Sequence, residues 1–402
     1  MKILIIGGTR FSGRRISLEA LASGHELTIF HRGGRSLCPE LVESSATIII
    51  GNRDCDQDLS ALCIEKKWDI TIDMCAYRPN QIDKLNRALG VSGGKYILIS
   101  SISAYSEENP YDVVEAAARL VDLSSVQGED TDTDLIAIDD ITYGALKVLC
   151  EQRVTDLYSD NYIILRPSYI IGPHDYSMRF PTWVQRIQAA YVSFTHTKEV
   201  AQVEAPCPAT NPMQFIDARD FALFVLQMVE ADTRHVDAVH VAMKNHITFE
   251  EMLHIIRDAV HQKMFITPHN NKNNTLSTDE CDTEEKEMVS VSAVTFKWIP
   301  VTEAVLRTDD FPLWDSPGTP SPLNAVCSDK ARQLGLQCRS LQESVWGVMD
   351  WLAMLPEWMN KLAGAAGTML GTEAGAELEW LQYVAGYFVL PRCVLLCYCV
   401  TI

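Results

Sequence analysis

The sequence lacks the spacings that mark metal sites and redox-active disulfides. Its 12 cysteines are scattered without a CxxC pair, and its 10 histidines include no HExxH motif. A zinc site or a redox-active disulfide needs such closely spaced ligands or thiols. Several cysteines stand in apolar runs instead, where a reduced thiol behaves as a small hydrophobic side chain. We therefore expect no metal in this protein.

A secretory leader and an excess of positive charge are also missing. Met1 and Lys2 lead directly into Ile3–Ile6, an apolar run far shorter than that of a signal peptide. The missing leader and the unpaired cysteines together predict a cytoplasmic protein. The formal net charge is −19, and lysine and arginine form no basic stripe. Such a surface repels a polyanion, so nucleic acid is not an expected partner.

The first part of the chain alternates short β-branched runs with amphipathic stretches. This is the pattern of parallel strands joined by crossover helices. It predicts an α/β protein with a Rossmann, doubly wound parallel sheet in residues 1–175. The strands are expected at Lys2–Ile6, Glu26–His31, Thr47–Gly51, Ile70–Met74, Tyr96–Ser100 and Tyr162–Pro167. The long acidic stretch Ser106–Ile141 is expected to form a partly ordered insertion over the site.

The second part of the chain predicts a smaller, mixed α/β substrate lobe, mainly in residues 176–360. Residues 213–242 are expected to return to the cofactor-binding domain. The predicted helices are Phe180–Ala190, Asp220–Glu230 and Thr248–Ala259, and the predicted strands are Met213–Ile216 and Ala238–Val241. Thr248, with Glu251 three residues later, is expected to cap the third helix. His269–Glu287 has the composition of an exposed loop.

Residues 361–402 form an apolar C-terminal extension. Within it, Trp380–Ile402 is strongly apolar and aromatic and is broken by Pro391-Arg392. Its length reaches the lower limit of a membrane span, but a proline and an arginine near the middle make a span costly. Three alternatives stay open: a buried or interfacial helix and strand, a tail in contact with a membrane, and a sequence variant without a defined role.

A glycine-rich loop follows the first predicted strand. It reads GGTRFSG over residues 7–13 and opens a helix near Arg14. Glycine at both ends allows a sharp turn and close packing of the helix on the strand, while free helix amides face a pyrophosphate. A plain tight turn is the alternative, but a position between an apolar strand and a helix favours a dinucleotide. The residues expected to contact the cofactor are Gly7, Thr9, Arg10, Phe11 and Gly13.

The end of the second predicted strand lacks the acidic residue that binds the ribose 2′-hydroxyl of NAD. His31 and Arg32 stand there instead, with Arg35 close by and Arg10 in the glycine loop. Guanidinium groups offer planar, bidentate donors that suit a 2′-phosphate. NADP is therefore the expected cofactor, and NAD with merely solvated arginines is the alternative.

Tyr143 and Lys147 form a YxxxK motif in a predicted helix. A spacing of four places the phenol and the ammonium on one face, one turn apart. The lysine can lower the pKa of the tyrosine and hold the nicotinamide ribose, which leaves the phenol as a general acid or base. Other residues at the ends of neighbouring strands support a catalytic role for this motif. Ser100-Ser101 ends the fifth strand, where a hydroxyl can bind a substrate oxygen, and Arg166-Pro167 ends the next strand.

These motifs occur together in the order of a known family. The chain resembles an extended short-chain dehydrogenase/reductase of the NAD-dependent epimerase/dehydratase family from Met1 to about Trp351. GGTRFSG, ILISSISAY, TYGALK, ILRPSYIIGPHD and MQFIDARDFA carry the resemblance. It implies that Tyr143 is the catalytic acid or base, Lys147 its partner and Ser101 the substrate-orienting hydroxyl. It also implies cofactor contacts from Lys147 and from residues that follow the strands, namely Asp54, Cys75, Ala76, Pro167, Tyr169 and Ile170.

The resemblance further implies hydride transfer at a carbonyl or alcohol carbon by a reductase, epimerase or dehydratase, on a small molecule such as a nucleotide sugar. Arg10 replaces the middle glycine of the family's loop, as in a subgroup that includes bacterial reductase-like proteins and chloroplast stem-loop RNA-binding proteins. The alternative is a catalytically silent, cofactor-bound scaffold or an RNA-binding protein of the same fold. A homodimer is left open. His174 and Asp175 are expected to shape the substrate lobe, and Asp217–Asp220 either to contact substrate or to tie the lobe to the core.

Overall fold

The computed structural model describes most of the chain between its first residue and Leu355. The described residues are 1–33, 38–62, 67–106, 109, 112–116, 120–123, 135–139, 142–231, 236–266, 289–314 and 325–355. The predicted loop 269–287, the apolar tail 380–402, Arg35 and much of the insertion 106–141 lie outside them.

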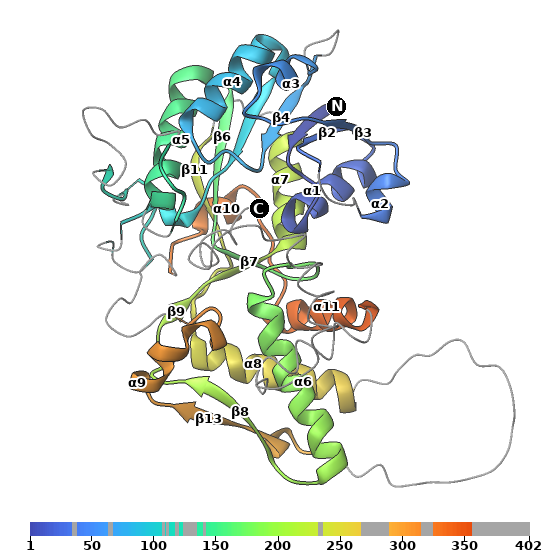
Figure 1. Cartoon of the computed structure of the whole chain (residues 1–402), viewed down its shortest axis with the longest axis vertical. Coiled ribbons are helices and arrows are strands. Elements are labelled where there is room, and N and C mark those ends of the chain that lie inside the picture. Colours follow the sequence, from blue (N-terminus) through green and yellow to red (C-terminus); the bar gives the residue numbers. More distant parts are fainter. Residues whose placement is uncertain are drawn as a thin grey trace, which may run out of the picture.

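A seven-stranded sheet forms the upper part of the molecule in Figure 1. Its strands are β1 (Lys2–Ile6), β2 (Glu26–His31), β3 (Thr47–Ile50), β4 (Ile70–Asp73), β5 (Lys95–Ile99), β6 (Tyr162–Pro167) and β11 (Val236–Val241). They lie in the order β11-β6-β5-β4-β1-β2-β3, and every neighbouring pair is parallel. The predicted doubly wound parallel sheet is confirmed. Its order reverses between β1 and β4, where sheets of this kind bind ligands.

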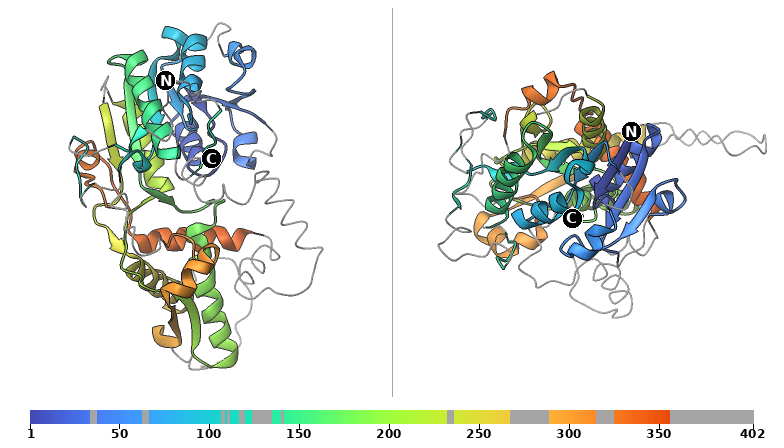
Figure 2. Two further views of the ribbon diagram at one scale, coloured as in Figure 1. Left: turned by 60° about the vertical axis from the view of Figure 1, so that its left-hand side comes forward. Right: turned by 90° about the horizontal axis from the view of Figure 1, so that it is seen from above.

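Helices cover both faces of the sheet, because its central strands are apolar on both sides. In β1, Ile3 and Ile5 join the core beneath α1 (Phe11–Ala22) and α7 (Ala218–Glu230). Leu4 and Ile6 of the same strand point the other way, into the core beneath α4 (Pro79–Leu89) and α5 (Thr142–Tyr158). Figure 2 shows this arrangement from above, with helices on each side of the strands.

A second hydrophobic core lies below the sheet in Figure 1. It is built from α6 (Arg179–Thr197), α8 (Phe249–His261) and α11 (Leu341–Met354), with a parallel pair formed by β8 (Ala201–Pro206) and β13 (Val294–Ile299). Thr248 caps α8 in a capping box with Glu251, as predicted. The shorter helices of the chain are α2 (Pro39–Val42), α3 (Asp56–Ser60), α9 (Val301–Ala304) and α10 (Asp329–Gln333).

The strand predicted at Met213–Ile216 is wrong as one element. The chain forms β9 (Pro212–Met213), which pairs with β12 (Ile247–Thr248), and then β10 (Phe215–Asp217), which pairs with β7 (Tyr169–Ile171). Gln214 separates the two strands because its buried amide bonds the backbone of residues 243 and 326. A polar side chain satisfied in this way breaks the run that looked continuous in the sequence.

Residues 325–355 pass from one core to the other. In this stretch α10 packs on β11 at the sheet edge, and α11 packs on α6 and α8 (Figure 2). Among the helices that the structure describes, none has the length and apolar character needed to cross a membrane.

Candidate active site

The glycine loop lies where the strand order reverses, directly after β1. Gly7 and Gly8 have φ of 96° and 79°, a region that favours glycine. A Cβ on Gly13 would lie 2.8 Å from the Cα of Gly8, so the first turn of α1 packs against the loop itself. The Ser17 hydroxyl donates to the Gly8 carbonyl at 2.8 Å, and the Gly7 N–H donates to the Phe30 carbonyl at 2.9 Å. The loop is therefore fixed between α1 and the end of β2.

A buried ion pair fixes the loop that follows β4. Arg53 donates to both carboxylate oxygens of Asp73 at 2.7 and 2.8 Å, and the Tyr96 hydroxyl donates to Asp73 at 2.6 Å. The Cys75 N–H donates to the same carboxylate at 3.0 Å. Burial by itself raises the pKa of Asp73, but the charge and hydrogen bonds of Arg53 outweigh it and the pKa is lowered. Cys75 and Ala76 are thereby held beside the glycine loop, where a Cβ on Gly7 would lie 3.5 Å from the Cys75 sulfur.

Lys147 is buried at the centre of this arrangement. It is 0% exposed, and its ammonium donates to the carbonyls of Ala76 at 2.9 Å and Ile99 at 3.0 Å. The third N–H has no acceptor among the described residues. The nitrogen lies 5.8 Å from the centre of the Tyr143 ring and 5.0 Å from that of Tyr77. Burial lowers the pKa of Lys147, although nearby thiols and carboxylates raise it in part. The structure thus brings the YxxxK pair together with the loop after β4.

Ser101 begins the turn that packs on the first turn of α5. It is buried, accepts the N–H of Ser103 at 3.0 Å and donates its hydroxyl hydrogen to the Ser103 hydroxyl at 3.0 Å. The turn Ile102–Ala104 then touches α5, because a Cβ on Gly144 would lie 2.1 Å from the Ser103 carbonyl oxygen. Gly144 follows Tyr143 directly, so this approach sets the spacing between the serines and the phenol. Ser103 is a second hydroxyl that the motif analysis missed.

A buried polar network lies behind Lys147 and Ser101. Glu151, one helical turn after Lys147, binds Arg166 through two hydrogen bonds and accepts the Ser100 hydroxyl. Arg166 also donates to the Tyr105 hydroxyl at 2.5 Å, and that hydroxyl bonds the buried ring of His240. Burial raises the pKa of Tyr105 and lowers that of His240, although the Glu115 carboxylate raises the latter in part. The network ties the ends of β5, β6 and β11 together.

Comparison with known proteins assigns the family. A profile of the NAD dependent epimerase/dehydratase family matches residues 3–242. The chain belongs to this family. A comparison with curated proteins finds no significant match.

Solved structures share the fold of this family member over nearly all of their length. The UDP-glucose 4-epimerase of Thermotoga maritima, solved with UDP-glucose, is 12% identical, with a TM-score of 0.58, covering 88% of this chain and 99% of the other. An epimerase of Methanothermobacter thermautotrophicus is 14% identical, with a TM-score of 0.58, covering 87% of this chain and 91% of the other. The UDP-glucuronic acid 4-epimerase of Bacillus cereus, solved with UDP-glucuronic acid and NAD, is 15% identical, with a TM-score of 0.57, covering 89% of this chain and 100% of the other.

The described residues fit the dinucleotide that this family uses. The glycine loop leaves no room for side chains at Gly8 or Gly13, and no side chain caps the first amides of α1. Arg10 stands at the cap position, where it cannot accept from an N–H. Free amides and a spare N–H on buried Lys147 are the donors that a pyrophosphate and a ribose need. Thr9 and Arg10 are half-buried, and Phe11 is buried.

The residues expected near the adenosine part are placed as follows. His31 is half-buried at the end of β2, accepts the Gly33 N–H at 3.1 Å and has its pKa lowered by burial. Arg32 is exposed. Asp54 is exposed after β3, where it accepts the amide of Gln81 at 2.9 Å.

The residues expected near the nicotinamide lie at the ends of β6 and β7. Pro167 ends β6, Ile170 is buried, and Tyr169 is half-buried at the start of β7. The Arg179 guanidinium lies 5.4 Å from the centre of the Tyr169 ring. Among the described residues, no group of three or more histidine, cysteine, aspartate or glutamate side chains could hold a metal ion.

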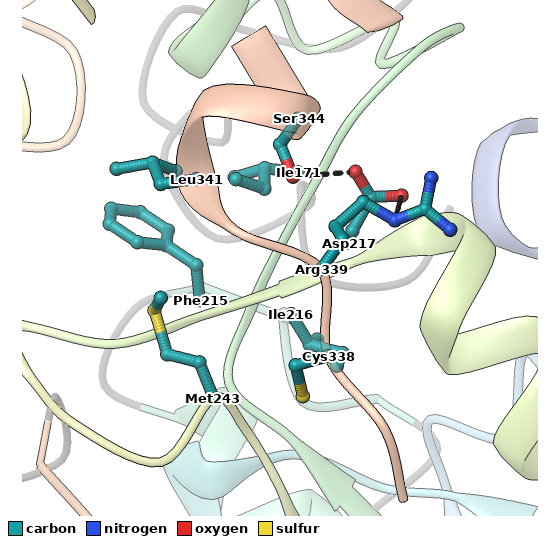
Figure 3. A pocket seen from close by; sticks show the side chains of 9 residues that line it. All are labelled: Ile171, Phe215, Ile216, Asp217, Met243, Cys338, Arg339, Leu341 and Ser344. Carbon is teal, nitrogen blue, oxygen red and sulfur yellow. Dashed lines mark hydrogen bonds and ion pairs between the residues drawn. The ribbon is translucent and has the colours of Figure 1, made fainter. Parts of the chain in front are cut away.

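The segment at Asp217 forms ion pairs, which was one of its two predicted roles. Arg219 binds Asp217 at 2.8 and 2.7 Å, and the Ser344 hydroxyl on α11 donates to Asp217 at 2.7 Å. Arg339 binds Asp220 at 3.0 and 2.6 Å. Figure 3 shows Asp217, Arg339 and Ser344 at a small cavity, whose other lining residues are Ile171, Phe215, Ile216, Met243, Cys338 and Leu341. The contacts link the start of α7 to α11.

Proposed function

We propose that the chain is an NAD(P)-dependent enzyme that transfers hydride at a carbonyl or alcohol carbon, with Tyr143 as the acid or base. The observation that carries this proposal is the position of Lys147. Its ammonium joins the loop after β4 to the end of β5, beside Tyr143, and β4 is one of the two strands that border the switch point of the sheet. A bound nicotinamide ring would supply or accept the hydride.

The side chains of the site divide the remaining work. Tyr143 is 3% exposed, so its phenol exchanges a proton in an environment with little water. The positive charge of Lys147 favours the phenolate and so eases release of that proton. Ser101, with Ser103 beside it, orients the substrate oxygen through a hydroxyl hydrogen bond. Reductases, epimerases and dehydratases share these groups and differ in the fate of the hydride.

We propose NADP as the preferred cofactor and a nucleotide sugar as the first substrate class to test. No acidic residue stands at the end of β2, where His31 and Arg32 follow one another. Two of the solved neighbours contain UDP-glucose, or UDP-glucuronic acid with NAD, which supports nucleotide sugars and keeps NAD as the alternative. We further propose a cytoplasmic enzyme in which residues 1–175 and 213–242 bind the cofactor and the remainder of residues 176–360 mainly binds the substrate.

The test begins with fluorescence titrations of NADPH and NADH on the full chain. Turnover is then sought with UDP-hexoses, UDP-hexuronic acids and simple carbonyl compounds. On any substrate found, Tyr143→Phe should lower kcat by about 100-fold or more, as expected for loss of a general acid or base. Tyr158→Phe at the far end of α5 is the matched control and should leave kcat unchanged. Failure to bind either nucleotide, or full activity in Tyr143→Phe, would refute the proposal.

A further inference from the structure

The connection between β7 and α6 contacts the glycine loop through one aromatic ring. The guanidinium carbon of Arg10 lies 3.5 Å from the centre of the Tyr176 ring, which is a close cation–π stack. Phe11 meets the same ring edge-on, with 6.4 Å between the ring centres. A residue from outside the Rossmann motif thus covers one face of the arginine that replaces the family's middle glycine.

The backbone of this connection is fixed by its own hydrogen bonds. Asp175 is buried, and its carboxylate accepts the N–H of Ser177 at 3.0 Å and the Ser177 hydroxyl at 2.5 Å. The Met178 N–H donates to the Asp175 carbonyl at 3.1 Å. His174 comes just before this turn, and the centre of its ring lies 5.5 Å from that of Trp351 on α11. The tyrosine ring is therefore presented to Arg10 by an ordered turn.

A stacked guanidinium loses little of its ability to bind an anion. The face of a stacked guanidinium lies on the ring, and its N–H donors lie in the plane of the group, where they can still bond an anion. Stacking also restricts the rotamers of the arginine before a ligand arrives, which reduces the entropy lost on binding. The glycine loop in which Arg10 lies is bonded to the end of β2 through Gly7 and Phe30. That edge of the sheet is where the phosphates of a dinucleotide are expected.

We infer that Tyr176 is a positioning residue that holds Arg10 as a phosphate-binding group for the dinucleotide. The inference rests on the proposed function, since it concerns the cofactor of the same site. The phosphate is either the 2′-phosphate of NADP or the pyrophosphate common to both nucleotides. The stacked Arg10 binds one of these two phosphate groups, and comparing the affinities for NADPH and NADH shows which one.

A double-mutant cycle with direct binding as the readout tests this inference. NADPH and NADH are titrated by fluorescence on the wild type, Tyr176→Leu, Tyr176→Phe, Arg10→Gln and Tyr176→Leu/Arg10→Gln. Tyr176→Leu should weaken NADPH binding by about threefold to tenfold, the range of a cation–π contact. Tyr176→Phe keeps an aromatic face and should bind as the wild type. Phe296→Leu, on β13 of the second core, is the control for loss of an aromatic ring, and circular dichroism checks that each variant folds.

The outcomes separate clearly. A loss for NADPH alone assigns the 2′-phosphate, and an equal loss for both nucleotides assigns the pyrophosphate. Either result supports the inference only if Tyr176→Leu has no further effect in the Arg10→Gln background. An unchanged affinity, a tighter affinity, or the same loss with and without Arg10 overturns it. If the wild type binds neither nucleotide, the proposed function fails, and that result is distinct from failure of the Tyr176 role.

Discussion

Replacing Gly144 by alanine isolates the contact that sets the distance between Tyr143 and the serines. In an exposed helix interior this change would stabilise the protein by about 1 kcal/mol, because alanine is the better helix former. Here the new Cβ would lie 2.1 Å from the Ser103 carbonyl oxygen. The obstacle is backbone, so no side-chain rotation relieves it. The turn Ile102–Ala104 and α5 must move apart instead.

The size of the effect follows from that overlap. Real Cβ atoms do not approach a neighbour closer than 3.0 Å, so the contact must lengthen by about 0.9 Å. Forcing an extra methyl group into a packed core costs about 1–3 kcal/mol, which cancels the gain in helix propensity or exceeds it. A displacement of about 1 Å between reacting groups can lower turnover by about 100-fold. Gly144→Ala should therefore lose much more activity than stability.

Urea unfolding and steady-state kinetics check both parts of this prediction. The free energy of unfolding should fall by about 0–2 kcal/mol, while kcat on a substrate accepted by the wild type falls by about 100-fold. Gly93→Ala in the turn Gly90–Gly93 is the control, because its Cβ would come no closer than 3.2 Å to its nearest neighbour, the Cβ of Leu89. A Gly144→Ala variant that gains about 1 kcal/mol of stability and keeps its kcat would show that the reasoning is wrong.

Buried Glu151 and half-buried His174 give two further predictions. Glu151→Gln should lower the free energy of unfolding by about 3–5 kcal/mol, because Arg166 stays charged and buried without its carboxylate. Urea unfolding measures this, and a loss below about 1 kcal/mol would contradict a buried charge pair. Burial lowers the pKa of His174 to about 4, so the unfolded chain takes up a proton that the native state refuses. The free energy of unfolding, measured with urea, should therefore fall as the pH drops from about 6.5 to about 4. His174→Gln should make this fall smaller. An unchanged pH dependence in His174→Gln would contradict this role of His174.

The fold could be predicted because each core strand carries its own local signal. β1 is apolar on both faces and is followed at once by a glycine loop, so its position in a parallel sheet was readable from a few residues. The local sequence pattern gave a wrong strand where successive residues pair with different strands. The run at Met213–Ile216 looked like one strand, and only the contacts of Gln214 with distant segments divide it into two. Long-range polar contacts of this kind leave no period in the sequence.

The site was predictable to the extent that its residues stand in motifs. The helical spacing of Tyr143 and Lys147 predicts that these two residues act together, whereas no motif in the sequence indicates the buried pair of Arg53 and Asp73. That pair links the loop after β3 to the end of β4, and charged residues at the end of a strand are most often solvated. A weak signal did exist for Glu151, which lies four residues after Lys147 and hence on the same helix face. His240 gave none, because a lone histidine in an apolar strand predicts nothing about its partner.

The distribution of buried charge explains why a chain of net charge −19 can still hold an anionic ligand. The two buried pairs beside the site, Arg53 with Asp73 and Arg166 with Glu151, are each neutral as a unit. Lys147, by contrast, has no ion-pair partner among the described residues, and its ammonium contacts only carbonyl oxygens. Carbonyl dipoles compensate a buried cation less fully than a carboxylate does. The site therefore keeps a local positive charge that favours a phenolate or a phosphate nearby, while the acidic outer surface sets the net charge of the protein.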